Sequence, residues 1–279
     1  GGSPLVSTFH SLGVRLLREF HEEAGLPRSF VIWDRDDSTR VIKKELERLG
    51  AGEPTPRAAL SAISRQKGGG VTRDAYAAKA THFRARTIAQ VWETYDKALT
   101  EEGALDFDDL LSRTLKLLRE HPDVLGKLRN RWSHITIDEY QDTNGVQFEI
   151  AKLLAGDQKN LCVVGDGDQN VYSWRGADMT YLLDFEHFFP GAKVVLLEQN
   201  YRSTRTILSA ANGVIAKNVR RKEKNLFTEN GTGEPIFLYP ARNEIDEAYF
   251  VAATAAKLLD EGMQAKEIAV LYRESSQSR

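Results

Sequence analysis

The sequence predicts an α/β fold in which buried parallel strands alternate with helices. The second half of the chain carries short runs of β-branched or aliphatic residues that have the length of strands: 135–137, 161–164, 194–197, 236–238 and 268–271. Between the first two runs, Val146, Ile150 and Leu154 recur at helical spacing, and this stretch closes at Gly156. Alternation of this kind is typical of a parallel sheet with crossover helices.

The composition favours a globular protein of roughly two domains over a disordered or membrane protein. The chain has 279 residues, of which 41% are hydrophobic and 28% charged, and no apolar run approaches the ~20 residues that span a bilayer. The net charge of −2 provides no overall attraction to nucleic acid, so any DNA binding must come from a local face. Residues 1–4 lack a basic region followed by an apolar one, which predicts no signal peptide and a cytoplasmic location.

The first half of the chain is predicted to be mostly helical. An apolar stripe at four-residue spacing indicates a helix over 10–24. Helical patterning continues over 34–103 with an interruption at the three glycines 68–70, and another helix is predicted over 106–119.

The acids at 106–109 and Cys162 are predicted to have structural rather than chemical roles. Asp106, Asp108 and Asp109 stand at the start of a predicted helix, where they favour the N-terminal dipole rather than a metal ion. Cys162 lies inside an apolar run and is predicted to be a buried small hydrophobe. The histidines are scattered without the spacing of metal ligands, so a zinc site is not expected.

Two adjacent carboxylates, Asp138 and Glu139, follow the strand predicted at 135–137. Ligands of open α/β sheets bind at the carboxyl ends of strands. One carboxylate there can hold the Mg²⁺ of a bound nucleotide while the next polarises the attacking water. A bare Asp-Glu pair is more often a pair of surface acids at a turn, so the assignment depends on the surrounding motifs.

The next predicted strand also ends in a polar loop, 165–177, which contains several glycines. Glycines let the backbone approach phosphates, and Gln169 can sense a γ-phosphate or orient water. Tyr172, Trp174 and Arg175 offer flat surfaces and a cation to single-stranded bases, whose stacking contributes ~1–3 kcal/mol per base. Core packing is the alternative for the two aromatic residues, but their polar neighbours disfavour a buried strand.

A third polar cluster, 198–203, follows the strand predicted at 194–197. Arg202 can reach a bound triphosphate as an arginine finger, and Tyr201 can stack on a base. Taken alone, this cluster is an ordinary polar loop.

Together these segments resemble the motifs of the UvrD/Rep/PcrA-like superfamily 1 DNA helicases. The segment 138–143 reads DEYQDT. The other segments that carry the resemblance, in the family's order and approximate spacing, are 8–12, 105–111, 165–177, 197–203, 268–273 and 277–279. The resemblance extends over essentially the whole chain, and several motifs in one order are far more specific than any single motif.

The resemblance implies roles in nucleotide chemistry for five residues. Asp138 resembles the magnesium-associated acid of the Walker B motif, and Glu139 the residue that activates the hydrolytic water. Gln169 resembles the γ-phosphate sensor that couples nucleotide state to DNA. Tyr201 is similar to the tyrosine that stacks on the adenine, and Arg202 to the arginine that reaches the γ-phosphate.

The resemblance also implies a DNA-binding surface and a set of partners. Thr8 and His10 resemble contacts to the DNA backbone, while Tyr172 and Trp174 resemble base-stacking residues with Arg175 beside them. Members of the family use ATP with Mg²⁺, move 3′→5′ on single-stranded DNA and unwind duplex, commonly in repair or replication restart. Single-stranded DNA, duplex junctions and repair or replication proteins are therefore the expected partners, and a membrane is not.

The fold that the resemblance implies is an α/β architecture with a RecA-like parallel sheet. Residues 1–22 and 105–189 are expected to form part of a first RecA-like domain. A helical domain is expected as an insertion at 23–104, followed by the start of a second RecA-like domain at 190–279.

Some features depart from the family's pattern. Gly167 stands where the family usually has an acidic residue or proline, and Asn170 where it has serine. No Gly-x-x-x-x-Gly-Lys-Ser/Thr phosphate loop occurs in the sequence, and the C-terminal helicase motifs are missing. We therefore expect an incomplete fragment of a helicase, with at most feeble ATPase activity when isolated.

Two other classes of protein compete with the helicase motor. One is a non-catalytic helicase-like DNA-binding module, against which the intact Asp138, Glu139, Gln169 and Arg202 argue. The other is a metal nuclease, which is disfavoured because the acidic clusters lack His or Lys partners in the sequence.

Overall fold

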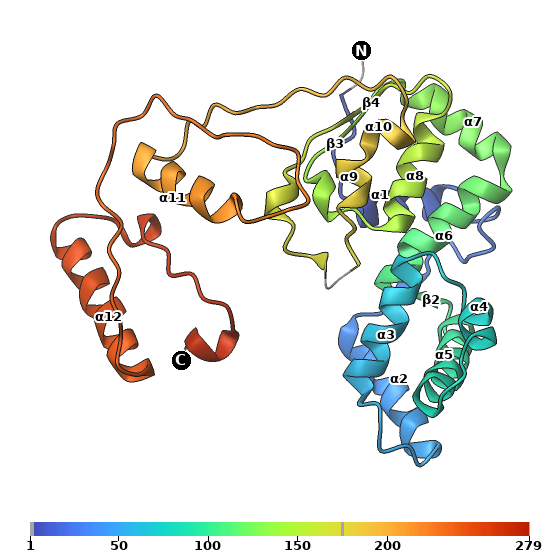
Figure 1. The fold of residues 1–279 in the computed structure, drawn as a ribbon. Coiled ribbons are helices and arrows are strands. Elements are labelled where there is room, and N and C mark those ends of the chain that lie inside the picture. The colour runs from blue at the N-terminus through green and yellow to red at the C-terminus, as the bar shows by residue number, and fades with distance from the viewer. Residues whose placement is uncertain (1–2, 174–175, 279) are drawn as a thin grey trace. The chain divides into compact units, whose positions relative to one another are not determined.

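The computed structural model describes residues 3–173 and 176–278. The chain divides into two compact units. The first comprises Gly1–Leu196 with Lys217–Lys224, and the second comprises Leu197–Ala216 with Asn225–Arg279. Figure 1 shows the elements of both units.

Helices dominate the first unit. They are α1 (Phe9–Glu19), α2 (Arg35–Arg48), α3 (Pro56–Gly68), α4 (Arg73–Ala78), α5 (Phe83–Glu101), α6 (Phe107–Glu120), α7 (Pro122–Arg131), α8 (Gly145–Ala155), α9 (Thr180–Leu183) and α10 (Phe185–Phe188). The strands and 3-10 turns are short: β1 (Val31–Ile32), β2 (Ala104–Leu105), β3 (Ile135–Ile137), β4 (Leu161–Val163), η1 (Tyr140–Asp142) and η2 (Gly167–Gln169).

Polar caps encoded in the sequence begin several of these helices. At the start of α1, Thr8 Oγ1 accepts a hydrogen bond from the Ser11 backbone N–H at 3.1 Å. At the start of α6, Asp106 and Asp109 exchange the reciprocal bonds of a capping box. The acids at 106–109 therefore lie at a helix N-terminus, as the sequence predicted.

The largest apolar core of the first unit lies among α1, α6, α7 and α8. Its largest fully buried side chains are Leu16, Leu17, Leu110, Leu117, Leu118, Leu128 and Ile150. α1 and α6 pack closely because Gly13 has no side chain: an added Cβ would lie 2.6 Å from the Leu110 carbonyl oxygen. The spacing that predicted these helices is the spacing of the residues that they bury.

A second apolar core joins α2, α3 and α5, while α4 packs on α5 (Figure 1). Its largest fully buried side chains are Trp92, Tyr95, Ile42 and Ile63. The helical patterning over 34–103 and its interruption after α3 are both present in the structure.

The two ends of this helical region come together in a small parallel sheet that the sequence did not predict. β1 pairs with β2 in the register Val31 with Ala104 and Ile32 with Leu105. Leu105 belongs to the first core and Ala104 to the second, so the two cores meet at this pair of strands.

β3 and β4 form a parallel pair, with Ile135 opposite Leu161 and Ile137 opposite Val163. α8 lies between them in the sequence, as expected for a crossover connection. A third cluster, built around Tyr140, Phe148 and Phe189, packs near this sheet. The predicted α/β class with parallel pairing is therefore confirmed in its coarse form, in sheets of two strands each.

The prediction that Cys162 is buried was wrong. Side chains alternate between the two faces of a strand, so Leu161 and Val163 point to one face and Cys162 to the other. Leu161 and Val163 pack against the third cluster, whereas Cys162 is exposed.

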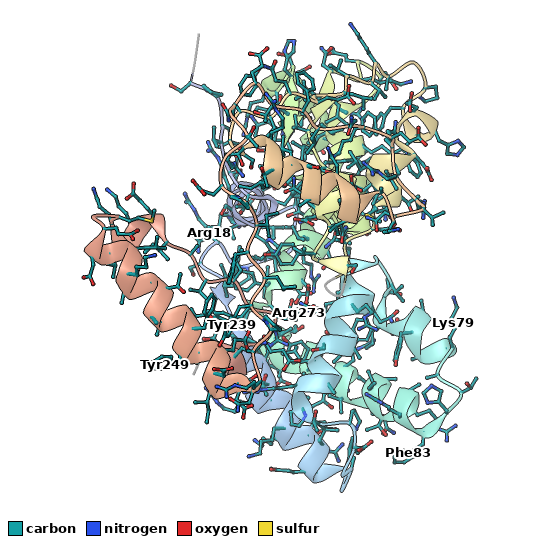
Figure 2. All side chains as sticks on the ribbon, turned by 60° about the vertical axis from the view of Figure 1, so that its left-hand side comes forward. Arg18, Lys79, Phe83, Tyr239, Tyr249 and Arg273 are labelled. Atoms are coloured by element: carbon teal, nitrogen blue, oxygen red, sulfur yellow. The ribbon has the colours of Figure 1, made fainter. Side chains whose placement is uncertain are left out.

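The second unit has α11 (Arg205–Ile215), α12 (Glu244–Asp260) and the 3-10 turns η4 (Ala265–Glu267) and η5 (Ser275–Ser278). An isolated parallel bridge joins Gln199 to Phe227. On α12, Phe250 stacks on the ring of Tyr239 with centroids 4.0 Å apart, and the neighbouring Tyr249 is exposed (Figure 2).

Three of the predicted strands are absent from the structure. The runs 194–197, 236–238 and 268–271 are not in strands, and residues such as Leu197, Phe237 and Leu271 are exposed. A strand requires a neighbour that pairs with its backbone N–H and C=O groups. Within the described part of the chain, no neighbour pairs with these runs.

No helix in the two described ranges has the length and apolar character needed to cross a membrane. Even α5, with 19 residues, carries charged side chains along its length.

Candidate active site

The site forms at one edge of the β3–β4 sheet, where both parallel strands end. Asp138 and Glu139 follow β3, and the loop that starts at Val164 follows β4. The Val164 N–H donates to the Ile137 carbonyl at 2.8 Å, and the Tyr140 N–H donates to the Val164 carbonyl at 2.9 Å. These bonds hold the two loops side by side at the point where they leave the sheet.

Glu139 has a left-handed backbone conformation, with φ 51° and ψ 42°. A residue other than glycine adopts this region at a cost of about 1–2 kcal/mol and is held there by its surroundings. Its own N–H donates to Asp138 Oδ1 at 2.9 Å, and the turn η1 follows directly. The conformation turns the chain sharply after Asp138 and leaves both carboxylates exposed at the sheet edge.

Gln141 connects the two loops through a side chain that is 1% exposed. Its Nε2 donates to Glu139 Oε2 at 2.6 Å, and its Oε1 accepts from the Asp166 N–H at 3.0 Å. Gly165 makes this approach possible, because a Cβ at that position would lie 2.8 Å from Gln141 Oε1. Gln141 thus fixes the Glu139 carboxylate relative to the loop after β4.

Gln169 lies in the same loop, at the end of η2. Its Nε2 donates to Asp166 Oδ2 at 2.8 Å, and its side chain is exposed. Nearby, Asn170 Nδ2 donates to the Gln141 carbonyl at 2.7 Å. The structure therefore brings Asp138, Glu139 and Gln169 to one sheet edge, as their places after two parallel strands predicted.

The electrostatics of this edge suit a bound cation. Among the described residues, Asp138 and Glu139 form no ion pair. Burial and the nearby Glu139 charge raise the pKa of Asp142 above its usual range. Mg²⁺ is commonly held by one or two protein carboxylates together with phosphate oxygens and water. Two exposed carboxylates without a cation partner fit that requirement, although no group of three or more potential ligands is found in the described ranges.

The predicted base-stacking residues follow in the same loop. Tyr172 is 41% exposed, and the loop turns back through a bond from the Ala177 N–H to the Tyr172 carbonyl at 3.4 Å. Trp174 and Arg175 lie outside the described residues. Their assignment to DNA stays a prediction.

Thr8 and His10 lie at the start of α1. The Thr8 hydroxyl caps the helix and lies 3.1 Å from Ser11 Oγ, yet the residue remains exposed. The His10 ring is half-buried, with its centroid 5.6 Å from that of Phe107. Burial lowers the pKa of His10, so the ring is neutral at pH 7. A neutral ring can donate a hydrogen bond to a phosphate but does not neutralise the charge of the phosphate.

Tyr201 and Arg202 lie in the second unit, on a turn organised by Asn200. Asn200 Oδ1 accepts from the backbone N–H groups of Arg202 at 3.0 Å and Ser203 at 2.8 Å. The ring of Tyr201 is 78% exposed, and its hydroxyl donates to Gln199 Oε1 at 2.9 Å. Both predicted side chains point into solvent from an ordered turn, and their approach to a nucleotide stays a prediction.

Two features of these clusters were not predicted from the sequence. Gln141 lies in the segment 138–143 and has no predicted role, although its position two residues after Glu139 was a signal for a side-chain link. The prediction that the acids at 106–109 lack a lysine partner was wrong, because Lys67 Nζ lies 2.8 Å from both Asp106 and Asp109. Lys67 is 39 and 42 residues away from these acids in the sequence, so spacing alone could not reveal it.

Comparison with known proteins gives a consistent result. The family model described as the UvrD/REP helicase N-terminal domain matches residues 2–190, and the UvrD-like helicase C-terminal domain matches residues 195–279. The chain is 45% identical over 276 residues to a Staphylococcus aureus protein named ATP-dependent DNA helicase PcrA, and 44% identical to the protein of that name from Staphylococcus epidermidis. These alignments cover 98% of this chain and 38% of each relative, so the chain spans well under half the length of the curated relatives that it matches.

Proposed function

The chain belongs to the UvrD/REP helicase family, and from that premise we propose that the complete protein is an ATP-dependent 3′→5′ DNA helicase and single-stranded DNA translocase. We place it in DNA repair or replication restart, and we assign this chain to part of its motor. The name of these relatives, ATP-dependent DNA helicase PcrA, supports DNA as the substrate and ATP as the energy source.

The observation that carries the proposal is the convergence of three side chains at one sheet edge. Asp138 would hold Mg²⁺ with the phosphates, and Glu139 would accept a proton from the attacking water. Gln169 would sense the γ-phosphate from the loop that continues into Tyr172. Bound ATP with Mg²⁺ supplies the phosphoanhydride bond whose hydrolysis drives movement along DNA.

The geometry around Glu139 suits a general base. Gln141 donates to Glu139 Oε2, which leaves Oε1 as the oxygen that can face water. The left-handed backbone and the bond to Gln141 restrict the carboxylate to few positions, and such restriction is what phosphoryl transfer requires of a protein.

The remaining site assignments belong to the same proposal. Tyr201 would stack on the adenine and Arg202 would reach the γ-phosphate, as their exposure on an ordered turn permits. Thr8 and His10 would contact the DNA backbone. Tyr172, Trp174 and Arg175 would hold unstacked bases.

We also propose the division of the chain that the resemblance implies. A first RecA-like domain would comprise 1–22 and 105–189, a helical insertion 23–104, and a second RecA-like domain would begin at 190. The separate apolar cores on either side of the β1–β2 pair support an inserted helical domain. Duplex junctions, repair or replication proteins and a cytoplasmic location complete the proposal.

The proposal is tested with the complete protein on duplexes that carry a single-stranded tail. ATP should drive strand separation on a 3′-tailed duplex and leave a 5′-tailed duplex intact. Glu139→Gln serves as the inactive control, since an amide keeps the shape of the side chain but cannot take a proton from water.

A non-catalytic DNA-binding module gives a different result. It would bind the tailed duplexes with an affinity that falls with salt and would hydrolyse no ATP. Equal unwinding of both tails would reject the proposed polarity while leaving the motor itself in place.

A further inference from the structure

A basic segment of the first unit, Lys217–Lys224, contacts the loops that follow β4. Its cations pair with acids as follows: Arg220 with Asp184 at 3.3 Å, Arg221 with Asp168 at 3.2 Å, Lys222 with Glu186 at 2.6 Å, and Lys224 with Asp166 and, at 3.7 Å, with Asp168. The basic segment is far from these acids in the sequence and lies outside the segments that resemble helicase motifs.

The ion pairs of the basic segment differ in burial. In the Arg221–Asp168 pair, the side chains are 15% and 8% exposed, whereas in the Lys222–Glu186 pair they are 33% and 54% exposed. Exposed pairs contribute little because solvent screens them. Breaking a shielded pair leaves a charge without its partner in a less polar environment. The contacts to Asp166 and Asp168 are therefore the consequential ones.

Asp166 takes part in several of the hydrogen bonds that organise the loop after β4, which contains Gln169. Its carboxylate accepts from the Asp168 N–H at 3.0 Å and from Gln169 Nε2 at 2.8 Å, and it pairs with Lys224 Nζ. Its own N–H donates to Gln141 Oε1 at 3.0 Å. The Asp166 carboxylate thus connects Lys224 to Gln169, and the Asp166 backbone N–H connects Asp166 to Gln141.

The charge state of Asp166 reflects these contacts. Burial raises the pKa of this carboxyl, but hydrogen bonds from Lys224 and Gln169 outweigh burial and hold the pKa below its usual range. Asp166 is therefore ionised at neutral pH, and its acceptor oxygens remain available to both partners.

We propose that Lys224 is a positioning residue, which holds Gln169 in place through the Asp166 carboxylate, with Arg221 supporting the same loop through Asp168. The proposal rests on the proposed function, because it assumes that Gln169 senses the nucleotide. Without the ammonium group, the Asp166 carboxylate keeps only the bonds from the Asp168 N–H and from Gln169 Nε2, so it holds the exposed Gln169 amide less firmly.

The test uses Lys224→Met in the complete protein, with Lys222→Met as the matched control. Lys222 lies two residues away in the same segment and pairs with Glu186. Within the described ranges, Glu186 forms no hydrogen bond or ion pair with Asp166 or Gln169. Hydrogen exchange reports the backbone amides of 166–169, and steady-state kinetics report ATP hydrolysis with single-stranded DNA.

We expect Lys224→Met to speed amide exchange at 166–169 and to lower kcat about tenfold, with KM for ATP changed less than twofold. Lys222→Met should match the unmodified protein in both measurements. Lys224→Arg keeps the charge and should restore most of the turnover. Asp166→Asn should resemble Lys224→Met, and the double variant should be no worse than either alone.

Equal effects of Lys224→Met and Lys222→Met would overturn the proposal, because the basic segment would then act only by docking. If Lys224→Met does not fold, Lys224→Arg and Asp166→Asn carry the comparison. If the unmodified protein hydrolyses no ATP, the proposed function fails. Exchange at 166–169 then decides separately whether Lys224 positions Gln169.

Discussion

Two clusters of carboxylate side chains in the first unit differ in burial and in whether a cation pairs with them. At the start of α6, Asp106 is buried and Asp109 is half-buried, and both bind Lys67. At the end of β3, Asp138 and Glu139 are exposed and bind no cation in the described ranges. The first cluster has its countercharge built in, whereas the second can accept one from solution.

The acids at the start of α6 connect the second core, among α2, α3 and α5, to the first core, among α1, α6, α7 and α8. Lys67 comes from α3, and the Tyr95 hydroxyl of α5 lies 2.9 Å from Asp106 Oδ2. Burial lowers the pKa of Lys67, but the charges of Asp109 and Asp106 raise it further, so it lies above its usual value. Lys67 therefore stabilises the fold at pH values below about 10.5 at which Asp106 and Asp109 are ionised, and this contribution is lost as the pH rises through its raised pKa.

The difference shows what the pattern of acids in a sequence leaves open, which is whether a countercharge from a distant element neutralises them. Asp106 and Asp138 both precede further acids, and both lie where a chain segment begins or ends. What separates them is a lysine from a distant helix. Burial with a fixed countercharge indicates a structural role, and exposure without one permits metal chemistry.

The difference between the two clusters is tested most directly by neutralising one acid of each cluster in the complete protein. Glu139→Gln should lower DNA-stimulated ATP turnover by about 10²–10⁴-fold, since it removes the proposed general base. The thermal midpoint and nucleotide affinity should stay close to those of the unmodified protein. Steady-state ATPase assays, thermal melts and a titration with fluorescent nucleotide measure the three quantities.

Asp106→Asn is the matched change in the other cluster. It should lower the thermal midpoint while turnover per folded molecule is retained. A loss of turnover in Asp106→Asn without loss of stability would place the α6 cluster in the catalytic machinery and end the distinction.

The second prediction concerns Lys67→Met, which leaves the two carboxylates without their partner. Removing one member of a buried ion pair typically costs about 3–5 kcal/mol, and we expect a loss of that order for α3 and α6. Native-state hydrogen exchange at amides of these helices gives the free energy of their opening.

A compensated variant sharpens that result. Lys67→Met combined with Asp106→Asn and Asp109→Asn removes all three charges and should recover part of the lost stability. If the triple variant is as unstable as Lys67→Met alone, packing of the lysine stem rather than charge explains the loss.

The parts of the fold that the sequence predicted are those set by local chemistry. Apolar spacing and polar caps located α1, α6 and α8, and the run that became β3 predicted where Asp138 would lie. These signals act within a few residues, so one sequence is enough to detect them.

The parts that could not be predicted depend on distant partners. Lys224 is 58 residues from Asp166, and no periodicity links them. The run 194–197 has the composition of a strand, but a strand also requires a partner, which local composition does not specify. The wrong prediction for Cys162 has the same cause, since burial of a strand face depends on what covers that face.

The third prediction tests the link between the two loops of the exposed cluster. Gln141→Leu removes the bond to Glu139 and leaves the Asp166 N–H without its acceptor. We expect turnover to fall roughly 10–100-fold, because Glu139, the proposed base, loses its fixed position. ATPase assays measure the loss, and Gln147→Leu is the control.

Gln147 belongs to the capping box of α8, six residues further along the chain. Its replacement should cost about 0.5–1 kcal/mol of stability and leave turnover unchanged. Equal turnover losses in both variants would show that any damage near β3 suffices, and the positioning role of Gln141 would be withdrawn.

The smallest expected effect is a pH dependence at Asp108, which lies between the two acids that bind Lys67. Burial and the nearby Asp106 raise the pKa of Asp108 to about 6 against a hydrogen bond from Ser64 and the charge of Lys67. A carboxyl with a raised pKa binds its proton more tightly in the folded state, so folding stability falls as the pH rises from about 4 to about 6. Asp108→Asn cannot ionise, and its stability relative to the unmodified protein should increase by about 1–2 kcal/mol across that window. Hydrogen exchange of α6 amides measured at several pH values, and corrected for intrinsic rates, gives this difference. A difference that stays flat with pH would mean that Asp108 is already solvated like an exposed acid, and the contrast between the buried and exposed clusters would then rest on Asp106 and Asp109 alone.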